Sequence, residues 1–312
     1  MRSLFASLAL AARTAALDVY GLQPVLLPRL PSGHMVLEQL GPAQQLGIDG
    51  TPSTLALLQS YVDLTHDEDE VIGGKLWPAV ALMCRWLLDA GPLAGSRVLE
   101  LGAGTGAGGL FASALGAAHV TLTDGGGEEV LSLLRRNAAA TAHLRRGNVE
   151  VAELCFGDRA TAKRLGARAD WVLAADVLYG QSESSSARGA EVEASADAGV
   201  RAEALADTLD ALLLLGCGEV TTVLPSGADQ PQRHRPPRVV LAHEHRARPL
   251  RGPLPWDSED DAVLCHFVDA ATRRGLRVTE LVSERPCVVL REPPFVHWSA
   301  DLSLLEVERV TP

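Results

Sequence analysis

The chain has 312 residues, of which 47% are hydrophobic and 21% charged, a composition typical of a folded globular protein rather than a disordered one. Its formal net charge of −11 argues against a protein that lives on nucleic acid, which normally has a basic surface. The 5 cysteines lack CxxC spacing, which argues against a disulfide framework or a zinc site. No apolar run reaches the ~18 residues of a membrane-spanning helix.

Residues 1–70 are expected to form an N-terminal extension with short apolar runs that prolines interrupt. The first 17 residues contain Arg2 and Arg13 but no acidic residue. That composition fits either an ordinary helix or an organellar transit peptide, and both interpretations stay open. We otherwise expect a cytoplasmic protein in which residues 71–312 form one domain.

From residue 77 onward, helical and strand patterns alternate. Helical patterns cover 77–89, a segment from about 108, 128–142, 202–215 and 261–275. Strand patterns cover 97–101, 119–124, 149–154, 169–179 and 238–246, and return near 276–282, 287–290 and 302–309. The alternation predicts an α/β fold with an open, Rossmann-like, mostly parallel seven-stranded sheet and helices on both faces.

One segment interrupts this alternation. Residues 181–200 are rich in Ser, Ala and Glu and lack large apolar side chains. Such a composition buries too little surface to order itself, so we predict a flexible insertion there.

A glycine-rich turn dominates the segment "RVLELGAGTGAGGLF", residues 97–111. This pattern is typical of a β-strand followed by a tight turn and a helix, with a ligand bound where the helix starts. The glycines admit two registers. Gly104, Gly106 and Gly109 spell GxGxxG, the dinucleotide fingerprint, whereas Gly102, Gly104 and Gly106 spell GxGxG, the loop of S-adenosylmethionine enzymes.

Two acidic residues bear on the choice between these ligands. Asp124 closes the next strand and suits the ribose hydroxyls of either one. Glu100 discriminates, because a pyrophosphate over this turn would lie near its carboxylate, at a cost that grows where water is scarce. S-adenosylmethionine has no phosphate and carries a cationic sulfonium and amino group. The sequence therefore favours S-adenosylmethionine.

The segments "VLELGAGTG", "VTLTD" and "AADVLY" resemble three motifs of the class I, seven-strand S-adenosylmethionine-dependent methyltransferases. With "GGKLWPA" before the first core helix and the acid-x-x-Tyr sequence at 176–179, the chain most resembles methyltransferase family 16, the protein-lysine methyltransferases. The resemblance covers roughly residues 55–282. It implies methyl transfer to a protein substrate, most simply to a lysine amine. A histidine or small-molecule acceptor, or a catalytically silent binding protein, stays open.

The resemblance also implies roles for individual residues. The implied cofactor-binding residues are Trp77, Gly102, Ala103, Gly104, Asp124, Phe156 and Ala175, and the glycine turn itself adds Glu100 and Gly106. Phe156 stands where the family often has a tryptophan beside the adenine, and Ala175 lies along the adenine side. Asp176 and Tyr179 are the implied catalytic residues.

We assign Asp176 orientation and electrostatics rather than strict base catalysis, because an aspartate pKa of ~3.9 matches an amine of ~10.4 poorly. A helix N-cap at Asp176 and plain packing of Tyr179 are the structural alternatives. Beyond this site, His243 and His245 alternate on a strand and would share a face, but no third ligand is evident, so we predict no metal. We expect a protein substrate, no nucleic-acid or membrane partner, and a monomer.

Overall fold

The computed structural model describes residues 72–74, 77–90, 93–144, 147–179, 190–215, 235–245, 261–289 and 298–310. The N-terminal extension predicted for residues 1–70 therefore lies outside the described residues. Within the described ranges, no helix is both long and apolar enough to cross a bilayer.

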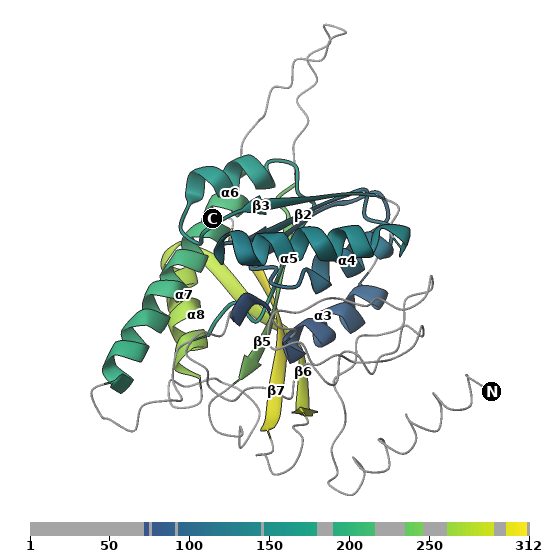
Figure 1. Ribbon diagram of the computed structural model, residues 1–312. Coiled ribbons are helices and arrows are strands. Elements are labelled where there is room, and N and C mark those ends of the chain that lie inside the picture. Colours follow the sequence, from purple (N-terminus) through teal and green to yellow (C-terminus); the bar gives the residue numbers. More distant parts are fainter. Residues whose placement is uncertain are drawn as a thin grey trace, which may run out of the picture.

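The core of the fold is a single seven-stranded sheet (Figure 1). Its strands are β1 Arg97–Leu101, β2 His119–Asp124, β3 Asn148–Glu153, β4 Trp171–Ala175, β5 Arg238–His245, β6 Leu276–Val289 and β7 Trp298–Arg309. They are arranged in the order β3-β2-β1-β4-β5-β7-β6. The first five pair in parallel, and β7 runs antiparallel to both of its neighbours. The open, mostly parallel seven-stranded sheet predicted from the sequence is confirmed.

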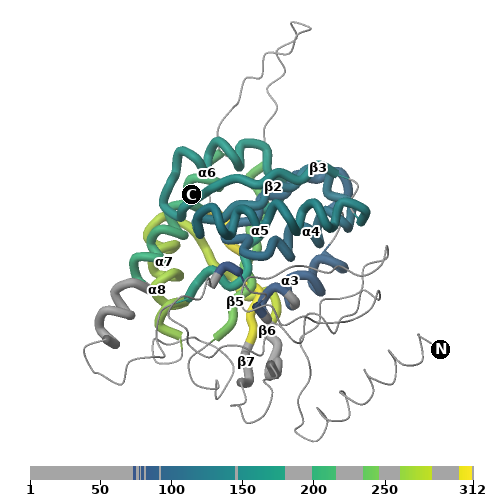
Figure 2. Tube along the Cα trace, in the orientation of Figure 1, coloured from purple at the N-terminus to yellow at the C-terminus, as the bar shows by residue number. Residues whose placement is uncertain are grey.

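Helices cover both faces of this sheet (Figure 2). They are α3 Pro78–Asp89, α4 Ala107–Ala114, α5 Gly127–Ala140, α6 Arg159–Gly166, α7 Ala190–Leu214 and α8 Ala262–Arg273, with short 3-10 turns η1 Ile72–Gly74 and η2 Ala142–Leu144. Helices α3, α4 and α5 pack on one face and α6, α7 and α8 on the other, around two separate apolar clusters. Near-continuous apolar strands such as "VLEL" and "WVLAA" follow from this burial on both faces.

Local sequence signals explain where several helices begin. Pro78 opens α3, where its missing N–H is not needed. The side chains of Asp158 and Asp261 cap α6 and α8 by accepting hydrogen bonds from the N–H groups of Thr161 (3.0 Å) and Leu264 (2.9 Å).

The structure differs from the predicted elements in two places. Helix α7 begins at Ala190, so the second half of the segment predicted as a flexible insertion, 190–200, is helical. Alanine and glutamate are strong helix formers, and a low apolar content hid this helix because no burial pattern marks it. The first half, 181–189, lies outside the described residues. Near the C-terminus, the strands predicted at 276–282 and 287–290 form one strand, β6, with two register irregularities.

Candidate active site

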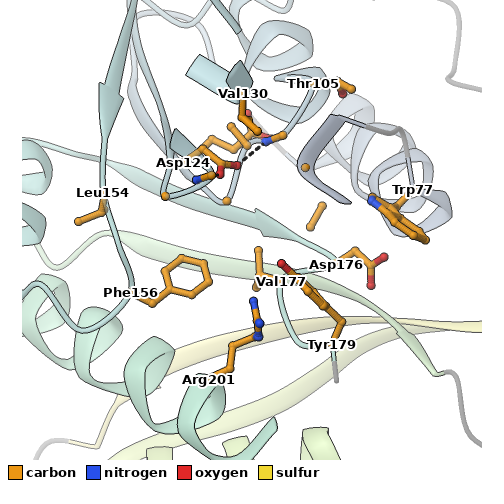
Figure 3. Close-up of a pocket in the computed structure, with 18 of the residues that line it drawn as sticks. Trp77, Thr105, Asp124, Val130, Leu154, Phe156, Asp176, Val177, Tyr179 and Arg201 are labelled. Atoms are coloured by element: carbon orange, nitrogen blue, oxygen red, sulfur yellow. Dashed lines mark hydrogen bonds between the residues drawn. The ribbon is translucent and has the colours of Figure 1, made fainter. Parts of the chain in front are cut away.

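A cavity of about 530 Å³ opens at the carboxyl ends of β1, β2 and β4. This is the edge at which open α/β sheets bind ligands, next to the point where strand order changes direction. Figure 3 shows Trp77, Asp176 and Tyr179 toward one end of the view and Leu154 and Phe156 toward the other, with Asp124 and Val130 above them. The predicted site residues that line it are Trp77, Glu100, Gly102, Ala103, Gly104, Asp124, Phe156, Ala175, Asp176 and Tyr179.

Gly106 is the one predicted site residue outside this lining. It precedes α4 with a φ of 83°, a conformation that suits glycine. A Cβ at this position would meet the side chains of Leu134, Leu110 and Leu122 at 3.0–3.2 Å. The structure thus gives Gly106 a role in packing the turn rather than contact with a ligand.

The other two loop glycines are also required by the surrounding protein. Gly102 and Gly104 have φ values of 59° and 52°. A Cβ on Gly104 would lie 2.7 Å from the carbonyl oxygen of Gly73, and one on Gly102 would lie 2.7 Å from Val177. The loop is therefore clamped between η1 and the segment after β4. A larger residue at Gly104 would collide with the backbone of η1.

Asp124 braces this loop from the end of β2. Its Oδ2 accepts a hydrogen bond from Gly104 N–H and its Oδ1 one from Gly126 N–H, both at 2.8 Å. The residue is 9% exposed and lines the cavity. Each carboxylate oxygen keeps further acceptor capacity, so Asp124 can accept from a ligand hydroxyl while it holds two loops in place.

Glu100 lies on β1 with its carboxyl group turned toward the start of α4. Oε2 accepts a hydrogen bond from the Gly109 N–H at 2.9 Å, and the side chain is 2% exposed. A Cβ on Gly108 or Gly109 would lie 2.5 or 2.8 Å from the two carboxyl oxygens. The glycine pair after the loop thus makes room for this carboxyl group.

Burial raises the pKa of Glu100 from 4.5 to about 8. Hydrogen bonds from the Gly109 and Gly108 N–H groups oppose the rise, and the nearby charge of Asp124 adds to it. At neutral pH the group is therefore mostly protonated. Glu100 therefore attracts a cationic ligand less strongly than the sequence suggested, because the free protein carries little negative charge there.

Glu100 discriminates between ligands in a second way. A dinucleotide pyrophosphate is held by the free N–H groups at a helix N-terminus. In α4 the Gly109 N–H already donates to Glu100, and the pKa of Glu100 also responds to the Gly108 N–H. The first turn of α4 is therefore engaged by a carboxyl group where a phosphate would have to bind.

Asp176 and Tyr179 follow β4 at the same edge. Asp176 is 5% exposed, and its backbone has a φ of 56°, the left-handed region that few non-glycine residues adopt. Its N–H donates to the carbonyl of Ala242 on β5 at 2.8 Å. Residues 177–179 are not helical, so the described chain offers no helix for Asp176 to cap. Backbone strain of this kind is found where surrounding contacts hold a functional residue in place.

Arg201 was not predicted as a site residue. It comes from α7, lines the cavity, and places its guanidinium carbon 4.1 Å from the centroid of the Tyr179 ring (Figure 3). The sequence offered no signal for it, since Arg201 lies between the predicted insertion and the predicted start of the next helix.

The two histidines of "AHEHR" lie beside an acidic side chain, Asp261, that was not predicted to be near them. His243 and His245 point to the same face of β5, as strand alternation predicts, and both contact Asp261 at the start of α8. The sequence made no third ligand-type side chain evident, and the fold places Asp261 beside the two histidines. Asp261 is 18 and 16 residues away along the chain, so only the fold reveals it.

Comparison with known proteins supports the resemblance. The profile of a family described as lysine methyltransferase matches residues 57–186. The chain is 36% identical over 110 residues to protein N-lysine methyltransferase METTL21A of Danio rerio, a match that covers 35% of this chain and 49% of that protein. It is 32% identical over 120 residues to protein-lysine methyltransferase METTL21E of Bos taurus, covering 36% and 40%. The matches thus span about half or less of these relatives.

Among solved structures, magnesium protoporphyrin IX methyltransferase of Synechocystis, with bound SAH, aligns over 74% of this chain and 82% of its own at 16% identity. Its TM-score is 0.39. The family match is the informative one. Segment 57–186 contains every residue predicted for the cofactor site and both predicted catalytic residues. Over that segment, the resemblance to the lysine methyltransferase family predicted from the sequence is confirmed.

Proposed function

We propose that this protein transfers a methyl group from S-adenosylmethionine to a lysine side-chain amine of a protein substrate. The observation that carries the proposal is the cavity at the carboxyl edge of the sheet, where a carboxyl group engages the first turn of α4 and an acid-x-x-Tyr segment follows β4. The similarity to proteins named as protein-lysine methyltransferases supports the choice of acceptor.

The cavity residues fit the proposed cofactor. A volume of about 530 Å³ falls within the range of small-molecule sites. Asp124 would accept hydrogen bonds from ribose hydroxyls, Phe156 would offer an apolar ring face to the adenine, and Gly102 to Gly104 would border the amino-acid part. When bound, S-adenosylmethionine supplies a methyl group activated by a sulfonium.

At the acceptor end, the protein's task is to present an uncharged amine in line with the methyl carbon and to exclude water. Asp176, held by its backbone bond to Ala242, would attract and orient the amine. The Tyr179 ring would form one wall of the channel, and Arg201 fixes that ring by covering its face. The positive charge of Arg201 would also disfavour an amine that is still protonated.

The remaining expectations about partners belong to this proposal. We infer a protein substrate, and the net charge of −11 favours one whose lysine lies in a basic surface. A monomeric enzyme in the cytoplasm that does not act on nucleic acid completes the proposal.

The test is transfer of radiolabelled methyl groups from S-adenosylmethionine to proteins of a source lysate, followed by mass spectrometry of the labelled proteins. We expect label on lysine side chains with wild-type protein. Asp176→Ala should lose most of that label while its affinity for S-adenosylmethionine stays within about threefold of wild type. Label on another residue type would show that lysine is not the methyl acceptor. Equal labelling by Asp176→Ala would show that the carboxylate of the acid-x-x-Tyr segment takes no part in the reaction.

A further inference from the structure

A buried polar cluster lies at the carboxyl end of β5, outside the cavity. It consists of His243 and His245 on β5, Asp261 at the start of α8, Ser303 on β7 and Glu280 on β6. The first four are all 5% exposed or less. The proposed methyl transfer uses none of these side chains. Burying so many polar side chains together costs free energy, because each one loses its hydrogen bonds to water and needs a partner inside the protein.

The cluster is centred on one carboxylate oxygen. His243 Nε2 lies 2.7 Å and His245 Nδ1 lies 2.9 Å from Oδ2 of Asp261. The other carboxylate oxygen of Asp261 accepts a hydrogen bond from Leu264 N–H, which fixes the carboxylate at the first turn of α8. The two imidazole rings stand almost perpendicular, at 84°, with centroids 4.9 Å apart. Two ring nitrogens and one oxygen thus converge from two elements on a single point.

The outer atoms of the two rings differ. His245 Nε2 lies 2.8 Å from Ser303 Oγ, which in turn donates to Oε1 of Glu280 at 2.6 Å. This chain runs from imidazole through hydroxyl to carboxylate, and such a chain orients histidines that bind metals through the opposite nitrogen. His243 Nδ1 is buried and has no hydrogen-bond partner among the described residues. It can carry the ring proton if Nε2 becomes a ligand.

We propose that His243, His245 and Asp261 bind one divalent transition-metal ion of the Zn²⁺ class. Two imidazole nitrogens and one carboxylate oxygen form a donor set that such ions favour. The three donor atoms lie within 4.8 Å of one another and are all buried. At metal–ligand distances of ~2.0–2.1 Å, tetrahedral donors are roughly 3.3 Å apart, so each of the two histidine nitrogens needs to move only about half an ångström away from Asp261 Oδ2.

The protonation states that the three ligands need are ordinary ones. Asp261 would ligate as a carboxylate, and both histidines can ligate as neutral rings once each ring proton sits on the outer nitrogen.

The position of the cluster suggests what the ion stabilises. Ala242, the residue before His243, accepts the backbone hydrogen bond of Asp176. A metal between β5 and α8 would therefore fix the strand that supports the acceptor end of the cavity. The proposal concerns the ligands alone and does not depend on the identity of the methyl acceptor.

The test uses full-length protein freed of metal with a chelator and titrated with Zn²⁺ in competition with a chromophoric indicator. Co²⁺ serves as a spectroscopic probe of tetrahedral coordination. We expect one equivalent bound per chain and a rise in melting temperature with Zn²⁺. Asp261→Asn, which keeps an acceptor for Leu264 N–H, should lower Zn²⁺ affinity at least about a hundredfold, and Ser303→Ala about 10- to 100-fold.

His266→Ala is the matched control, because His266 is an exposed histidine on the same helix, α8. This variant should bind Zn²⁺ as the wild type does. The proposal is overturned if wild-type protein binds no Zn²⁺ or Co²⁺ at equimolar concentration. It is also overturned if Asp261→Asn, checked for folding by circular dichroism, binds Zn²⁺ as tightly as His266→Ala.

Discussion

Glu100→Gln should remove a pH dependence of stability that the buried carboxyl group imposes on the protein. Glu100 is 2% exposed and accepts the Gly109 N–H, and its pKa is raised from 4.5 to about 8. The folded protein therefore keeps a proton that the unfolded chain releases above its ordinary pKa. Stability from this group is complete below pH 4.5 and is lost as the pH rises toward 8. Glutamine is a neutral side chain of the same shape and does not titrate.

The size of the effect follows from the two pKa values. One pKa unit corresponds to about 1.4 kcal/mol, so the full difference between 4.5 and about 8 corresponds to about 5 kcal/mol. Over the accessible window from about pH 5 to pH 7, the wild type should lose about 2–3 kcal/mol of unfolding free energy through Glu100 alone. Asp158 and Asp207 have lowered pKa values and act in the opposite sense, but below this window.

The assay is urea unfolding of wild-type protein and Glu100→Gln at several pH values between 5 and 7. The difference in unfolding free energy, wild type minus variant, should fall by about 2–3 kcal/mol across the series, since all other titrating groups cancel. Parallel pH profiles for the two proteins would contradict a raised pKa of Glu100 in the folded state. They would mean that Glu100 is already ionised in the folded protein, so its negative charge would be available to attract a cationic ligand.

Three further variants separate the parts of the site. Asp124→Asn places an amide donor against one of two backbone N–H groups, so we expect unfolding by urea to show a loss of about 1–3 kcal/mol and calorimetry to show roughly 10- to 100-fold weaker binding of S-adenosylmethionine. Tyr179→Phe keeps the ring beneath Arg201, so stability and cofactor affinity should be unchanged while turnover falls less than in Asp176→Ala; full turnover would make the hydroxyl dispensable. Arg201→Met should lower stability by about 0.5–2 kcal/mol in the same unfolding assay, and no change would show that the contact with Tyr179 contributes nothing.

Much of the fold could be predicted because its signals are local. The strands 97–101 and 119–124 match the observed bounds, since each is a short apolar run delimited by turns. Most residues that line the cavity could also be predicted from the sequence, because parallel strands bring their carboxyl ends to the same edge of the sheet. Residues as distant as Trp77 and Tyr179 meet there for that reason.

The features that escaped prediction depend on contacts between distant segments or on side-chain direction. Arg201 reaches the cavity because α7 extends further toward its N-terminus than its apolar pattern indicates. Asp261 joins the histidines only because α8 begins beside β5. Glu100 could be assigned to the ligand turn from its position, but whether its carboxyl group faces the ligand or the amides of α4 depends on the crossing of that helix.

The most direct test of the account is calorimetric titration of wild-type protein with S-adenosylmethionine and, separately, with NAD. Asp124 lines the cavity where it would accept from a ribose, while Glu100 engages the Gly109 N–H of α4 that a pyrophosphate would need. We expect saturable binding of one S-adenosylmethionine per chain and no detectable heat from NAD. Saturable binding of NAD without binding of S-adenosylmethionine would contradict this expectation.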